Sequence, residues 1–145
     1  MERAKRLLFD TSVYITAIRS GLFSPAFRMI QESLPRTHLA SVVSAELLVG
    51  ATTPAARRAV LTFILRVHTV RRVVTPDAGT WERAGELLGR IRQDEPHLRS
   101  KIPTLWNDLL IALSARQIGA IVVTQNARDF TLIRRYLRFD LQILS

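Results

Sequence analysis

The 145-residue sequence contains no cysteine, which excludes disulfide bonds, thiolate zinc sites and thiol nucleophiles. It has no apolar run near the roughly 18 residues that a membrane span needs. Its basic N-terminus reaches an acid after only three apolar residues, unlike a signal peptide. The motifs GxGxxG, GxxxxGK[ST] and GxSxG are absent as well, so the sequence gives no support to the corresponding nucleotide-binding loops or to a serine-hydrolase site. These absences predict a cytoplasmic protein without a membrane segment.

Acidic residues are also few. Twelve Asp and Glu stand against twenty-one Lys and Arg, so the formal net charge is +9 and the sequence pI is about 11.4. Only two of the basic residues are lysine; the others are arginine, whose planar guanidinium can grip a phosphate at two points. A GC-rich genome would favour arginine codons too, but it accounts less well for the shortage of acids. The charge balance therefore indicates a nucleic-acid partner or an acidic protein partner.

The hydrophobic pattern predicts one α/β domain over residues 1–145. Short apolar strands alternate with helices, which favours a mostly parallel twisted sheet of about five strands between two layers of helices. Strands are expected over 5–9, 37–40, 70–74, 120–123 and 139–144. Helices are expected over 11–19, 25–34, 42–50, 54–68, 77–93, 104–118 and 127–136, with an irregular loop over 94–103.

Polar clusters follow two of the expected strands. Asp10-Thr11-Ser12 comes directly after the first strand, and Thr124-Gln125-Asn126 comes after the strand over 120–123. In a parallel sheet, ligands bind beyond the carboxyl ends of the strands, where the strand order reverses. Asp10 also fits the N-cap of the following helix, which is an ordinary structural role. The two clusters are nevertheless the first candidates for a functional site.

Two further acids fall on helix faces that should pack on the core. Glu46 has Val42 and Val49 on its face, and Asp108 lies in TLWNDLLIALSA, which is apolar nearly all round. A salt bridge to an arginine would explain either acid alone. Together with Asp10, however, they form a set of like charges that needs a cation to stay ionised. Oxygen ligands without cysteine or paired histidines favour Mg²⁺ or Mn²⁺ over zinc.

Four segments resemble the motifs of PIN domains, in particular the VapC-type toxins of bacterial type II toxin–antitoxin systems. They occur in family order and span nearly the whole chain. The segments are FDTSVYI at 9–15, SAELLVGA at 44–51, NDLLIALSA at 107–115 and VVTQNARDF at 122–130. The resemblance implies a PIN-like fold in which Asp10, Glu46 and Asp108 are the catalytic acids and hold the metal. Thr11, Ser12 and Asn107, beside these acids, are expected to support them.

The last segment departs from the family pattern. Many relatives carry an acid where this sequence has Asn126, and Asp129 follows three residues later. Either Asn126 binds the metal through its carbonyl or a water, or Asp129 supplies the charge; both stay candidate metal ligands, with Asn126 favoured. Thr124 is expected to orient Asp10 or a metal-bound water by its hydroxyl.

The resemblance implies a Mg²⁺- or Mn²⁺-dependent endoribonuclease that hydrolyses RNA to leave a 5′-phosphate and a 3′-hydroxyl. Such a toxin would block translation or growth, and single-stranded or looped RNA is the expected substrate, because A-form grooves are hard to read. The implied partners are RNA, a second copy of the chain and a small antitoxin that covers the helices over 11–19 and 25–34. Whether one or two metal ions bind stays open.

Two alternatives use the same fold. One is a basic α/β module that binds nucleic acid or a protein partner without cutting. The other is a phosphoryl-accepting protein with Asp10 as its nucleophile. The phosphatase version of the second needs another aspartate where Ser12 stands, and the receiver version needs an acidic pair near the first strand.

Overall fold

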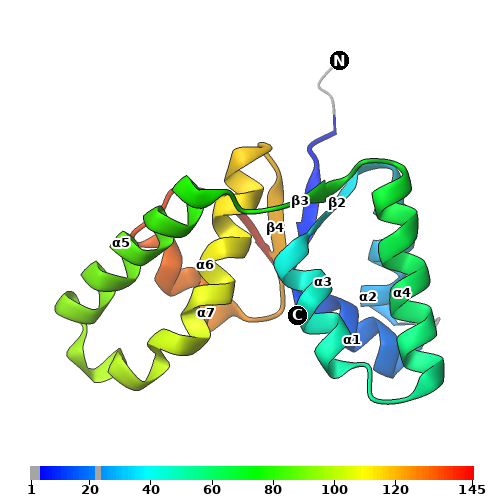
Figure 1. Ribbon diagram of the computed structural model, residues 1–145, viewed down its shortest axis with the longest axis horizontal. Helices are drawn as coiled ribbons and strands as arrows, with labels where there is room; N and C mark the ends of the chain where they lie inside the picture. The colour runs from blue at the N-terminus through cyan, green and yellow to red at the C-terminus, as the bar shows by residue number, and fades with distance from the viewer. Residues whose placement is uncertain (1–3, 22–23) are drawn as a thin grey trace.

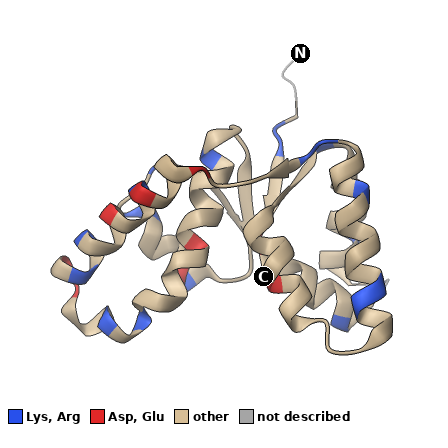
Figure 2. Ribbon diagram, in the orientation of Figure 1, with Lys and Arg blue, Asp and Glu red and all other residues tan. Residues whose placement is uncertain are grey.

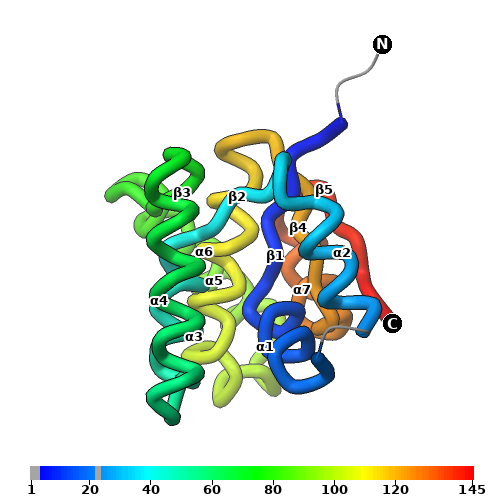
Figure 3. The backbone as a smooth tube through the Cα atoms, turned by 90° about the vertical axis from the view of Figure 1, so that its right-hand side faces the viewer, coloured from blue at the N-terminus to red at the C-terminus, as the bar shows by residue number. Residues whose placement is uncertain are grey.

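A computed structural model describes residues 4–21 and 24–145 and contains a five-stranded sheet with helices on both faces (Figure 1). All strand pairs are parallel, and the order across the sheet is β3-β2-β1-β4-β5 (Figure 3). The strands are β1 (Leu7–Phe9), β2 (Thr37–Ala40), β3 (Val73–Val74), β4 (Ile121–Thr124) and β5 (Asp140–Ile143). The predicted parallel α/β sandwich is therefore confirmed.

The helices form one layer on each side of the sheet (Figure 1). One layer comprises α1 (Thr11–Ser20), α2 (Pro25–Ser33), α3 (Ser41–Gly50) and α4 (Pro54–Thr69). The other comprises α5 (Ala78–Asp94), α6 (Ile102–Gln117) and α7 (Ala127–Arg134). Short 3-10 helices occupy Leu34–Arg36 and Pro96–Lys101. None of the helices in the described ranges is long and apolar enough to cross a membrane.

Local capping explains where several helices begin and end. The side chains of Ser24, Thr53 and Asp77 each accept a hydrogen bond from the backbone N–H three residues later, at the start of α2, α4 and α5. The chain turns just beyond α6 at Gly119, whose φ of 66° favours glycine. These signals are local, which is why the sequence predicts most helix bounds within one or two residues.

Two predicted segments are wrong in part. The strand expected over 70–74 contains only Val73–Val74, because α4 continues to Thr69 and the chain then turns through Arg71, with a φ of 57°. The loop expected over 94–103 is largely helical, since it holds the 3-10 helix Pro96–Lys101 and the first residues of α6. Both of these helices carry a proline in their first turn, where its missing N–H has no intrahelical partner to lose.

The centre of the sheet is fully enclosed. Leu7, Leu8 and Phe9 of β1 are at most 1% exposed, so this strand is covered on both faces. The helix α6 packs on the sheet with fully buried side chains such as Leu109 and Ile111. The residue that follows β1 therefore projects from a strand that is buried on both faces.

Candidate functional site

The strand order reverses between β1 and β4, and the carboxyl ends of these two strands meet at one edge of the sheet. Asp10 follows β1, its backbone N–H donates to the carbonyl of Val123 at 2.8 Å, and Thr124 ends β4. In Figure 2, one acidic segment of α3 and one of α6 lie on either side of this edge. The predicted polar clusters therefore meet at the position where parallel sheets bind ligands.

The Asp10 carboxylate is held by three hydrogen bonds. Its Oδ1 accepts from the backbone N–H of Thr11 at 2.8 Å, and its Oδ2 accepts from Ser12 Oγ at 2.9 Å and Thr124 Oγ1 at 2.8 Å. The side chain is almost fully buried, at 5% exposure. Thr124 thus contacts Asp10 in the way that the sequence predicts, and the acid has a fixed orientation.

Glu46 lies on α3 and faces Asp10. Its Oε1 accepts from Thr11 Oγ1 at 2.9 Å. Burial raises the pKa of Glu46 above its ordinary value and the charge of Asp10 adds to this, while hydrogen bonds from Thr11 and Asn107 oppose it. The expectation that its whole face packs on the core is wrong, since Val49 is 84% exposed. The helix is covered by the sheet on one side only, so Glu46 is half-buried at the rim of the site.

Asp108 lies on α6 and is also half-buried. Burial raises the pKa of Asp108 to about 8, and repulsion from Asp10, Asp129 and Glu46 contributes, whereas Lys101 opposes the shift. Four acids from separate parts of the chain therefore act on one another electrostatically. That Asp10, Glu46 and Asp108 form one catalytic site stays a prediction.

Asn126 and Asp129 bond to each other at the start of α7. Asn126 Oδ1 accepts from the Asp129 backbone N–H at 3.3 Å, and Asn126 Nδ2 donates to Asp129 Oδ2 at 3.0 Å. Asp129 Oδ1 forms an ion pair with Lys101 Nζ at 2.6 Å. Reasoning from the sequence gave Lys101 no role; its only signal was a basic residue just ahead of the helix that carries Asp108.

The donor set fits a hard divalent cation in its chemistry. The candidate ligands are all oxygens, and their mutual repulsion is what such a cation relieves. Among residues 4–21 and 24–145, however, no group of three or more His, Asp or Glu side chains has the spacing that would hold a metal ion. Binding would therefore require the carboxylates to turn toward one another from the positions described above.

A family model for the PIN domain matches residues 7–136. The chain belongs to the PIN domain family. PIN domains are in general nucleases that use divalent metal ions, and the match covers the strands, helices and acids of the site. The family that the four sequence segments predict is therefore confirmed. No curated protein is significantly similar to this PIN domain in sequence.

Several solved structures share the fold. A chain of VapBC2 from Rickettsia felis has a TM-score of 0.66 and 22% identity, over 96% of this chain and 98% of that one. A chain of VapBC from Salmonella typhimurium has a TM-score of 0.62 and 23% identity, over 97% and 98%. A chain of FitAcB from Neisseria gonorrhoeae has a TM-score of 0.62 and 16% identity, over 93% and 95%. At these identities the similarity shows the fold.

The raised pKa of Asp108 makes a pH-dependent difference in stability measurable. Because its pKa rises from 3.8 to about 8 on folding, the folded state binds the proton more tightly than the unfolded state. This group's contribution to stability is therefore lost as pH rises from about 4 to about 8. Asp108→Asn should accordingly be more stable than the wild type near pH 8 and similar to it near pH 4, in urea unfolding with EDTA. A difference that does not change with pH would contradict the assignment.

Proposed function

We propose that this PIN domain is a Mg²⁺- or Mn²⁺-dependent endoribonuclease and the toxin of a toxin–antitoxin pair. The observation that carries the proposal is the coupling of Asp10, Glu46 and Asp108 at the carboxyl ends of β1 and β4. The net charge of +9 favours a polyanionic substrate. A module that only binds phosphate gains nothing from half-buried carboxylates that repel it, so the structure favours the nuclease over that alternative.

The roles of the side chains follow from their contacts. Bound Mg²⁺ or Mn²⁺ would lower the pKa of a water and offset charge on the phosphate. Asp10, Glu46 and Asp108 would hold the ion. Ser12 and Thr124 fix the direction of the Asp10 carboxylate.

The remaining candidates would act around these three acids. Thr11 Oγ1 donates a hydrogen bond to Glu46, and the Asn107 side chain lowers the pKa of Glu46, so both would help to orient this acid. Asn126 and Asp129 are proposed to supply further oxygen atoms or support from the start of α7. Loss of such supporting contacts typically reduces metal affinity or activity by about 10–100-fold.

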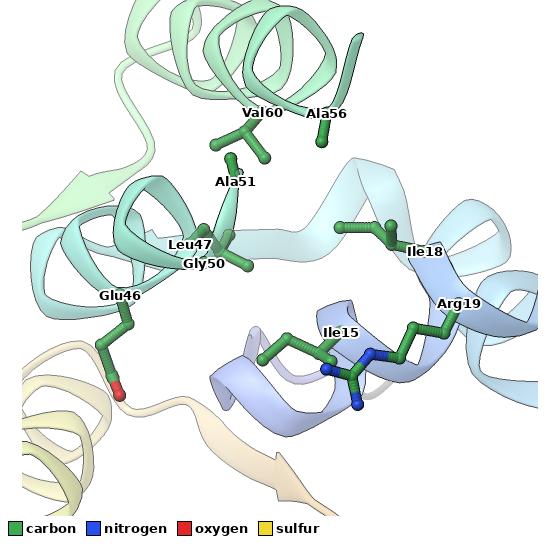
Figure 4. Close-up of a pocket in the computed structure, with 9 residues that line it drawn as sticks. All are labelled: Ile15, Ile18, Arg19, Glu46, Leu47, Gly50, Ala51, Ala56 and Val60. Atoms are coloured by element: carbon green, nitrogen blue, oxygen red, sulfur yellow. The ribbon is translucent and has the colours of Figure 1, made fainter. Parts of the chain in front are cut away.

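An apolar groove offers a surface for an antitoxin. It lies between α1, α2 and α4, has a volume of about 210 Å³, and is lined by residues such as Tyr14, Ile18 and Phe27. An adjoining cavity of about 120 Å³ extends to Glu46, with Arg19 on α1 across from it (Figure 4). An antitoxin helix with an apolar face would fit this groove, and the chain that follows it would reach the acids. The similar structures named VapBC support an antitoxin partner.

The surface proposed for a homodimer is a different groove. The groove between α3, α5 and α6 is lined by Val42, Val49 and Trp81, and the last two are 84% and 50% exposed. Exposed apolar patches of this kind commonly mark protein interfaces. Glu46 and Asn107 line the same groove, so a homodimer formed here would border both sites.

Cleavage of total cellular RNA by the purified protein tests the nuclease. Products are expected with Mn²⁺ or Mg²⁺, none with EDTA, and none from Asp108→Asn, because that variant loses a ligand charge. Asp140→Asn is the matched control, since this exposed acid lies at the amino end of β5 and pairs with Lys5. Metal-independent RNA binding that Asp108→Asn leaves intact, without cleavage by any form, would instead support the binding module.

Sedimentation of the protein tests the dimer. The wild type is expected to be dimeric, and Val49→Glu should be monomeric because it places a charge in the apolar groove. Leu65→Glu, at a 67% exposed position on α4, should remain dimeric. A Val49→Glu protein that keeps the wild-type mass would rule out this surface.

Crosslinking tests the antitoxin groove. A photoreactive residue at Ile18, which is 59% exposed, should capture the small protein that copurifies with the chain and inhibits cleavage. The same residue at Leu65 should not, because Leu65 is not among the groove's lining residues. An inhibitor whose crosslinks leave both α1 and α2 untouched would disprove this placement.

A further inference from the structure

Lys101 places an ammonium group beside the acids. It is the last residue of the 3-10 helix Pro96–Lys101 and directly precedes α6. Its Nζ lies 2.6 Å from Asp129 Oδ1, and the side chains of Lys101 and Asp129 are only 26% and 11% exposed. It is also the cation whose charge acts against the repulsion felt by Asp108. An ion pair so shielded from water and so close to the acids has an electrostatic effect on the site.

The choice of lysine is unusual for this sequence. The chain uses arginine at nineteen of its twenty-one Lys and Arg positions, and Lys5 is the other lysine. An ammonium is a compact point charge with three N–H donors, whereas a guanidinium is a wide planar fork. The ion pair with Asp129 needs at most one of the three N–H donors of Lys101. A second donor can therefore reach a phosphate oxygen without breaking that pair.

The contacts of Asp129 decide what else can bind there. Its Oδ1 faces Lys101 and its Oδ2 accepts from Asn126, so partners in this chain engage both oxygens. In two-metal nucleases the ions lie roughly 3.5–4 Å apart and share the carboxylates between them. The Lys101 ammonium lies against Asp129 Oδ1, so a second ion on that oxygen would have to displace it.

Lys101 and its partner Asp129 both line a groove. This groove has a volume of about 420 Å³, and its lining includes Lys101, Arg128, Arg135 and His97. Asp129 and Glu95 are its acids, and each forms an ion pair with one of the lining cations. The lining has three Lys and Arg side chains against two acids, so the groove keeps a small excess of positive charge that a phosphate could contact beside Asp129.

We propose that Lys101 is a built-in second cation, which stands in for a second divalent ion and binds a phosphate of the RNA while Asp129 holds it in place. The inference rests on the function proposed above and deepens it. The site then holds one divalent ion on Asp10, Glu46 and Asp108. Lys101 acts as a substrate-binding residue, and Asp129 as a positioning residue rather than a metal ligand.

Titration calorimetry with Mn²⁺ tests the metal side of the proposal. The wild type should bind one ion per chain, and Asp129→Asn should still bind one. Lys101→Met should bind the ion several-fold more tightly, because it removes a nearby positive charge. Lys5→Met is the matched control and should bind like the wild type, since Lys5 pairs with Asp140 at the amino ends of the strands. Lys101→Arg keeps the charge, and melting temperatures establish that each variant is folded.

Binding of a single-stranded RNA oligonucleotide tests the substrate side. In the Asp108→Asn background, which prevents cleavage, Lys101→Met should weaken RNA binding. The plot of log K against log salt should become less steep by about 0.7, the value for one lost phosphate contact. Lys5→Met should leave the slope unchanged. If Lys101 only held Asp129 in place, Lys101→Met would not both tighten Mn²⁺ binding and weaken RNA binding.

The outcomes separate this inference from the proposed function. Two Mn²⁺ ions in the wild type that fall to one in Asp129→Asn would overturn the inference and leave the nuclease standing. A folded Lys101→Met protein with the Mn²⁺ affinity and the salt slope of the wild type would also overturn the inference and leave the nuclease standing. A wild-type protein that binds no Mn²⁺ would overturn the proposed function and the inference with it.

Discussion

Repulsion among carboxylates at the carboxyl ends of β1 and β4 is the constraint that the surrounding structure has to meet. Asp10 cannot move away, because it follows a strand that is buried on both faces and its backbone is bonded to β4. α3 and α6 then bring Glu46 and Asp108 toward it from opposite sides of the sheet. The large buried surface of α6 and β1 stabilises this arrangement, so the core supports an electrostatically unfavourable cluster.

The chain compensates these acids unequally. Asp10 receives three hydrogen bonds and Asp129 is paired with Lys101, whereas burial and repulsion raise the pKa values of Glu46 and Asp108. A cation bound by oxygen atoms would supply positive charge to offset the repulsion at Glu46 and Asp108. Asp10 and the two less fully compensated acids thus have different parts in one site: Asp10 sets its position, and Glu46 and Asp108 create its affinity for positive charge.

The sequence predicts what depends on local chemistry. Capping residues, prolines and apolar periodicity locate the helices, and acids among apolar neighbours single out Glu46 and Asp108 as candidates. It fails where distant segments meet. The length of β3 depends on how far α4 continues, and the exposed Val49 depends on which side of α3 the sheet covers. The ion pair of Lys101 with Asp129 joins residues on two different helical segments, so nothing in the spacing of either residue reveals it.

The central claim is that Asp10, Glu46 and Asp108 together hold a divalent ion. Crystals of the protein soaked in Mn²⁺ and measured for anomalous scattering test it directly. The account predicts a peak among the three carboxylates, within about 2.0–2.6 Å of an oxygen atom from each. An ordered site without such a peak at saturating Mn²⁺, or a peak bound by other residues alone, would contradict it.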